Sequence, residues 1–334
     1  MFLMKTRVKV RDEDYIYASA RTKAREASFM GEDGMARLVA MRDYDAALRF
    51  LSENGFEILR DKEGHADIEA MLDRYLERAY LLVSESVPDL DLFAFLRYPY
   101  DCHNIKSAIK AEFRKEDFGR LYMALGRFTQ KEIADMVAKR DFSKLPREMG
   151  KAAKQAISVY AATKDPQQID ILLDKACYGD MLKTAESYSQ KSFAALVKVK
   201  IDLVNLLTYM RLVRMGQGAE KSFFASFLEG GSLSEAWFAS AFKDGKERAA
   251  RSLAGSVYAS LAAFDGLSLA VLEKRADDLY IASVKKEAFA TYGAEVIAAF
   301  LVKREFEAKN IRIILAAKKA GLDSALIEER LRVL

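Results

Sequence analysis

Side chains suited to nucleophilic, acid–base or metal chemistry are sparse in this chain. Its two histidines, His65 and His103, stand in no HExxH motif and in no histidine–cysteine cluster. Cys102 directly precedes His103, and adjacent residues point to different sides of a helix, which disfavours a nucleophile–base pair. No glycine-rich stretch has the spacing and strand context of a nucleotide-binding loop. We therefore expect no catalytic residue, no metal site and no bound cofactor.

A more specific pattern surrounds three of the four asparagines. Asn104, Asn205 and Asn310 each follow an acidic residue by three positions and a basic residue by seven. The acids are Asp101, Asp202 and Glu307, and the basic residues are Arg97, Lys198 and Lys303. On a helix these spacings return to one broad face. Because asparagine is a mediocre helix former, each amide is expected to bridge to a neighbouring helix or loop. The motif then forms a structural network, and the alternative is a partner-binding surface.

The elements that carry these residues are predicted to be helices. Apolar residues recur at three- and four-residue spacing along most of the chain, as in Ile68, Met71, Leu72 and Tyr75. The chain holds only four prolines, and alternating β-patterns are confined to short pieces. The sequence therefore predicts an all-α protein. Residues 230–232 (Gly-Gly-Ser) are expected to form a helix C-cap and turn.

The asparagine motif belongs to a threefold internal repeat. Residues 68–74 recur as 169–175, at the same offset that separates Asn104 from Asn205, and residues 267–274 are a weaker third copy. We predict three helical domains, at residues 1–115, 116–217 and 218–334. Domains of this size can close their own cores. Three like domains can be arranged about a pseudo-threefold axis, which can enclose a funnel.

Composition excludes several classes of function. The formal net charge is +4, and acidic and basic residues are interleaved, so no focused basic field for nucleic acid is expected. Two cysteines do not make a disulfide framework, which favours the cytoplasm. Residues 1–5 lack the long apolar core of a signal peptide, and the uncharged stretches are too short to cross a bilayer. Membrane contact is expected only through a partner.

One stretch resembles a known signature. Residues 98–106 (Tyr-Pro-Tyr-Asp-Cys-His-Asn-Ile-Lys) resemble the Asp-x-x-Asn-Ile-Lys signature of the C subunit of V-type (archaeal-type) ATP synthases, the counterpart of the d subunit of the vacuolar ATPase. Near the N-terminus, residues 15–17 (Tyr-Ile-Tyr) and 20–26 look like the aromatic and arginine-rich opening helix of that family, with Lys23 where arginine is expected. Chain length and the all-helical plan match over the whole sequence.

This resemblance implies a function without catalysis. Members of the family are funnels of three similar helical domains that sit on the membrane rotor ring and receive the foot of the central shaft, made of the D and F subunits. The chain would be a central-stalk rotor subunit that couples ATP synthesis or hydrolysis to proton or sodium transport, peripheral to the membrane on its cytoplasmic side. Residues 54–66 are a candidate loop for contact with the ring. The alternative is a generic helical adaptor or scaffold protein.

Overall fold

The computed structural model describes residues 7–216, 218–288 and 291–334. Residues 1–5, where the sequence shows no apolar core of a signal peptide, lie outside the described ranges. Within these ranges every regular element is an α-helix or a short 3-10 helix, and β-pairing is limited to two isolated bridges, Val8 with Tyr188 and Arg60 with Ala66. The all-α prediction is confirmed. The contacts between Cα atoms divide the chain into two compact units.

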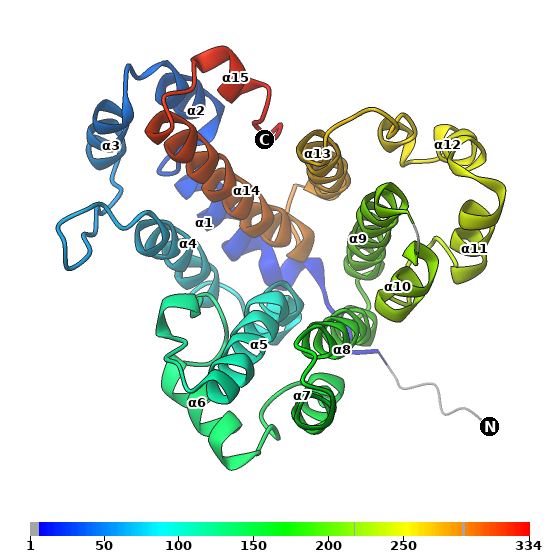
Figure 1. Cartoon of the computed structure of the whole chain (residues 1–334). Coiled ribbons are helices and arrows are strands. Elements are labelled where there is room, and N and C mark those ends of the chain that lie inside the picture. Colours follow the sequence, from blue (N-terminus) through cyan, green and yellow to red (C-terminus); the bar gives the residue numbers. More distant parts are fainter. Residues whose placement is uncertain (1–6, 217, 289–290) are drawn as a thin grey trace. The chain divides into compact units, whose positions relative to one another are not determined.

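The first unit comprises Met1–Val10 and Asp91–Asp265. Its main helices are α5 (Tyr98–Arg114), α6 (Gln130–Lys139), α7 (Arg147–Thr163), α8 (Gln167–Ser187), α9 (Lys191–Met215), α10 (Ala219–Ser226), α11 (Glu235–Asp244) and α12 (Lys246–Ala254). Helix α8 packs against α5, α7 and α9, and α10 covers α9 (Figure 1). Short 3-10 turns at Asp91–Leu96, Gly119–Leu121 and Ala259–Leu261 complete the unit.

The second unit comprises Arg11–Leu90 and Gly266–Leu334. It contains a 3-10 turn (Asp12–Tyr15) and helices α1 (Ile16–Glu26), α2 (Gly31–Ala40), α3 (Tyr44–Glu53), α4 (Ile68–Ser84), α13 (Leu269–Ala288), α14 (Ala294–Lys319) and α15 (Ser324–Glu328). Helix α14 contacts all the other helices of this unit and lies between α4 and α13 (Figure 1). Most of its residues are buried, from Ala294 to Ala317.

Local sequence explains where the motif-bearing helix α5 starts and stops. Pro99 lies in its first turn, where a missing N–H costs nothing, and Asp101 also lies in that turn. The helix ends at Lys115, which adopts the left-handed conformation with φ of +57°. Asn104 is therefore held in the second turn of a helix with a fixed start.

The segments that repeat in the sequence occupy similar positions in the two units. Residues 68–74 begin α4, which packs against α14, and residues 169–175 lie at the start of α8, which packs against α5. In both pairs a repeated segment lies on a helix that packs against an asparagine-bearing helix. The boundaries at 1–115, 116–217 and 218–334, and the funnel about a pseudo-threefold axis, stay predictions.

Candidate functional site

Asn104 holds the loop that follows its helix. Its Nδ2 donates to the carbonyl oxygen of Met123 at 2.9 Å, and its Oδ1 accepts from the backbone N–H of the same residue at 2.8 Å. One side-chain amide thus satisfies both polar groups of one residue. The asparagine is fully buried, so these bonds form away from water.

The other two asparagines make the same pair of bonds. Asn205 donates to the carbonyl of Leu228 at 2.8 Å and accepts from its N–H at 3.0 Å. Asn310 does the same with Arg332, at 3.0 Å for both bonds. All three asparagines are at most 1% exposed. We call each such doubly bonded asparagine, with the segment it holds, an asparagine clamp.

The acid one turn earlier binds backbone N–H groups in every copy. Asp101 accepts from the N–H of Arg127 at 2.6 Å, and Asp202 accepts from the N–H groups of Ser232 and Leu233, both at 2.9 Å. In the third copy, Glu307 accepts at 3.1 Å from Gly31, a residue 276 positions away. The first two acids therefore hold the loop that their asparagine holds, whereas the third connects α14 to the start of α2.

Each acid also has a side-chain partner that sequence reasoning missed. Asp101 pairs with the Arg127 guanidinium at 2.6 Å, and Asp202 accepts from the Tyr258 hydroxyl at 2.6 Å. Glu307 accepts from the Tyr75 hydroxyl at 2.5 Å and pairs with Arg304 at 2.9 Å. The distance in sequence between an acid and its side-chain partner differs in each copy. The repeated spacing that identified the acids therefore could not identify the partners.

Burial controls the protonation equilibria of these clusters. Desolvation raises the pKa of Asp101 above its ordinary value, although Arg127 acts in the opposite direction. The pKa of Glu307 is raised for the same reason, against the effect of Arg304. Burial, together with the neighbouring Asp202 carboxylate, raises the pKa of Tyr258. This tyrosine therefore stays a hydrogen-bond donor well above the pH at which an exposed phenol ionises.

Two glycines allow the loops to approach the acids. A Cβ atom built on Gly126 would lie 2.9 Å from Asp101 Oδ1, and one on Gly231 would lie 2.1 Å from Asp202 Oδ1. Residues 230–232 do form a turn, but the predicted C-cap is wrong, because α10 already ends at Ser226 and is capped by Phe227. Sequence reasoning missed the role of these glycines. Their similar distances from the acids, 25 and 29 positions, are a signal that could have indicated it.

The basic residues of the motif do not behave alike. Arg97 joins its own cluster, since its Nε donates to the carbonyl of Leu125 at 2.9 Å and its Nη2 donates to that of Gly126. Lys198 lies 3.8 Å from Glu186, and Lys303 lies 2.9 Å from Glu26. The structure thus brings together acid and asparagine in each copy, and only the first copy adds its basic residue to the same loop.

The cysteine and histidine candidates are separated from each other. The Cys102 thiol is buried and lies 3.5 Å from the carbonyl of Leu173, whereas the His103 ring bonds the carbonyl of Leu121 at 2.8 Å. His65 lies in an exposed turn beside Asp61 and Glu63, 3.7 and 3.6 Å from their carboxylates. The exposed triplet of His65, Asp61 and Glu63 is the one group in the described ranges with the spacing of metal ligands. Exposed acidic groups commonly lie this close together without a bound ion, so the triplet by itself does not indicate a metal site.

Comparison with known proteins assigns the family. The sequence model of the family described as ATP synthase (C/AC39) subunit matches residues 18–330. The chain belongs to this family. It is 25% identical to the C subunit of the A-type ATP synthase of Methanosarcina mazei, over 96% of this chain and 93% of the relative. It is 22% identical to the C subunit of the V-type ATP synthase of Thermus thermophilus, over 95% and 98% of the two chains.

The name of a third relative includes the ion sodium. The chain is 20% identical to the C subunit of the V-type sodium ATPase of Enterococcus hirae, over 93% of this chain and 95% of the relative. The resemblance inferred from residues 98–106 is thereby confirmed, and the chain is a subunit of a rotary, ion-transporting ATPase of the V/A type. None of the described helices is long and apolar enough to cross a membrane.

Proposed function

We propose that the chain is a non-catalytic central-stalk subunit that passes rotation between the shaft, made of the D and F subunits, and the membrane rotor ring. The observation that carries the proposal is the match to the family of C subunits over almost the whole chain. In this role the protein lies on the cytoplasmic side of the membrane. It takes the form of three like domains around a funnel, and residues 54–66 contact the ring.

The asparagine clamps support a mechanical role. A part that transmits torque must resist deformation, and packed helices resist it well. Loops are the weaker part of a helical body, because few buried contacts hold them. Each clamp ties a loop or a terminal segment to a long helix through buried hydrogen bonds. We assign the motif a structural role, since asparagines that are at most 1% exposed are not available to a partner.

Binding to the shaft tests the proposal. The purified chain is mixed with the purified complex of the D and F subunits (the D–F complex) of the same organism and analysed by size-exclusion chromatography and calorimetry. We expect a one-to-one complex with a dissociation constant in the micromolar range or tighter. A dissociation constant on the order of ten micromolar corresponds to a binding free energy of about −7 kcal/mol. Absence of binding at protein concentrations of that order would contradict the role and favour a generic helical adaptor.

A further inference from the structure

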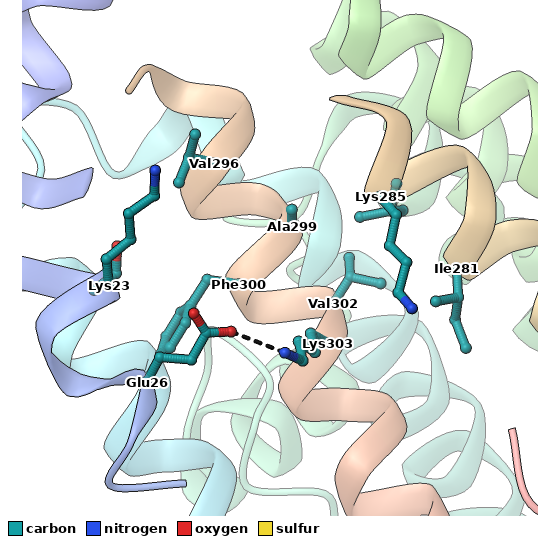
Figure 2. A pocket seen from close by; sticks show the side chains of 11 residues that line it. Lys23, Glu26, Ile281, Lys285, Val296, Ala299, Phe300, Val302 and Lys303 are labelled. Carbon is teal, nitrogen blue, oxygen red and sulfur yellow. Dashed lines mark hydrogen bonds and ion pairs between the residues drawn. The ribbon is translucent and has the colours of Figure 1, made fainter. Parts of the chain in front are cut away.

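An apolar cavity and a pair of thiols lie outside the asparagine clamps. The cavity measures about 180 Å³ and is lined by α1, α13 and α14; Figure 2 shows α14 between the side chains of the other two helices. Its lining lysines, Lys23, Lys285 and Lys303, already donate to oxygen atoms of this chain. The described side chains therefore favour no particular occupant. The thiols of Cys102 and Cys177, by contrast, have a definite chemistry.

The only two cysteines of the chain lie against each other, although 75 positions separate them in the sequence. Cys102 lies on α5 and Cys177 on α8, and these helices pack together in the first unit. The Cys102 thiol donates to the carbonyl oxygen of Leu173 at 3.5 Å, and Leu173 lies one helical turn before Cys177. One turn returns to the same face of a helix. The two thiols are accordingly within hydrogen-bonding reach of each other.

Such a contact is uncommon by chance. A buried residue touches roughly 6–12 others, so in a chain of 334 residues two cysteines placed at random would meet in roughly 2–4% of cases. Two thiols in contact are the reactants of a disulfide, which forms only between neighbouring residues. In a protein with no disulfide framework, such a pair is typical of a transient, redox-sensing bond. The contact therefore indicates reversible oxidation.

Burial controls when the pair can react. Both cysteines are 2% exposed. The hydrogen bond to Cys102, and then burial, raise the pKa of the Cys177 thiol well above its ordinary value. Since the thiolate is the reactive form, the pair is inert while α5 and α8 stay packed. Reaction requires a local opening of this contact, which exposes a thiol to solvent.

An ion pair lies between the thiols and solvent. The Cys102 Sγ is 3.7 Å from Oδ1 of Asp174, and the Lys106 ammonium is 2.7 Å from the same oxygen. The side chain of Asp174 is 42% exposed. Cys102 is therefore one side chain away from solvent, and a nearby ammonium favours its thiolate once the contact opens.

We propose that Cys102 and Cys177 are a redox-modification site whose oxidant is a low-molecular-weight disulfide such as glutathione disulfide. One cysteine, as its thiolate, attacks a sulfur of the oxidant; the S–S bond of the oxidant breaks, which gives a mixed disulfide and one small thiolate. The second cysteine attacks the cysteine sulfur of the mixed disulfide, forms the bond between Cys102 and Cys177, and releases a second small thiolate. The two cysteine protons pass to the two small thiolates. Two cysteine thiols are thus oxidised, and one small disulfide is reduced to two thiols.

The new bond fastens α5 to α8. Cys102 follows Asp101 directly and precedes Asn104 by two positions, so the bond is attached to the helix that carries the first clamp. A disulfide that closes a long loop stabilises a protein mainly by constraining its unfolded chain. The oxidised chain is therefore the more stable form, and a reductant restores the dithiol. This property belongs to the chain itself and does not depend on its partners.

Peptide mapping tests the site directly. The reduced full-length protein is incubated with glutathione disulfide, alkylated and cleaved with trypsin, which releases residues 98–106 and 176–183 with one cysteine each. We expect these peptides to be joined, at least about tenfold in excess of their glutathione adducts, because thiols in contact react at a high effective concentration. The melting temperature should rise by at least about 5 °C and return to its original value after treatment with dithiothreitol.

Cys102→Ala and Cys177→Ala are the matched controls. Each keeps one buried thiol, so neither should give the joined peptides, and the oxidant should leave their melting temperatures unchanged. If either variant fails to fold, the oxidised and re-reduced forms of the unmodified chain still give the comparison.

Three results would overturn the proposal. The first is two free thiols in the folded chain after prolonged oxidation. The second is a bond between Cys102 and Cys177 that forms only after unfolding in urea, which would show that the folded chain does not hold the thiols together. The third is a bond that leaves the melting temperature unchanged, which would show that it does not fasten α5 to α8.

Discussion

At the scale of single residues, the asparagine amide suits the clamp because it carries a donor and an acceptor side by side. A backbone residue presents an N–H and a C=O, and the asparagine amide binds both at once in all three copies. Aspartate offers no donor and leucine offers neither group. The helix-interior asparagine therefore contributes to stability through the hydrogen bonds that it makes with the segment it holds.

Replacing one clamp asparagine should destabilise the fold. In Asn205→Leu, the buried N–H and C=O of Leu228 lose their partners, and each unsatisfied group costs about 1–3 kcal/mol. We expect the free energy of unfolding, from urea denaturation, to fall by at least about 2 kcal/mol. The control is Asn54→Leu, which changes the exposed fourth asparagine and should cost less than about 1 kcal/mol. Unchanged stability of Asn205→Leu with weakened D–F binding would make the motif an interface instead.

Tyr258 should produce a measurable dependence of stability on alkaline pH. Its pKa is raised in the folded state, by burial first and then by Asp202. Its contribution to stability is therefore fully present below pH 10, the ordinary phenol pKa, and is lost as the pH rises towards the folded-state pKa. Above pH 10 the unfolded phenol ionises, and this one group lowers the free energy of unfolding by about 1.4 kcal/mol per pH unit.

The comparison between wild type and Tyr258→Phe isolates this contribution. Denaturation at pH 8 and at pH 11 should show a smaller loss of unfolding free energy in the variant, by about 1 kcal/mol. Equal losses in the two proteins would show that Tyr258 ionises normally in the folded state.

At the scale of elements, the acids and glycines fix how loops approach helices. The chain passes Asp101 at Gly126 and Asp202 at Gly231, too close for a side chain. In the third copy the longer Glu307 reaches Gly31 at 3.1 Å through a hydrogen bond. The repeat thus keeps the acid and the asparagine but changes the segment that the acid holds.

Two glycine substitutions should have opposite effects. In Gly231→Ala the new Cβ would lie 2.1 Å from Asp202 Oδ1, so the turn or the carboxylate must move, at a cost of about 1–3 kcal/mol. Gly179→Ala is the matched change inside α8, where nothing lies within 4 Å of the new methyl group. It should stabilise the protein by roughly 0.5–1 kcal/mol. Thermal unfolding measures both, and a stabilised Gly231→Ala would show that the close approach is not real.

The helices and the motif could be predicted from the sequence, but most of the clamp partners could not. Apolar periodicity depends on residues that are close in the sequence, so it predicted the helical class. The partners Met123, Leu228 and Arg332 contribute backbone atoms, which every residue type carries. The sequence pattern therefore could not indicate which residues the asparagines bind. The contact of Glu307 with Gly31 depends on how the chain folds over 276 positions.

At the scale of the whole molecule, we expect the protein to act as a rigid connector. Acidic and basic residues are interleaved along its sequence, and the buried clamp asparagines fasten segments together within each of the two units. In the proposed role such a body carries no reaction of its own. Its effect should therefore be on the coupling between ATP turnover and ion movement, and both processes can be measured in the assembled complex.

The coupling role is tested most directly by ATP-driven ion uptake in vesicles that contain the rotary complex depleted of this chain. We predict that the depleted complex hydrolyses ATP without accumulating ions, and that adding the purified chain restores uptake. The Asn205→Leu variant should restore it less well at temperatures where its fold is partly lost. Full ion uptake without the chain, or no recovery after the chain has bound, would contradict the coupling role.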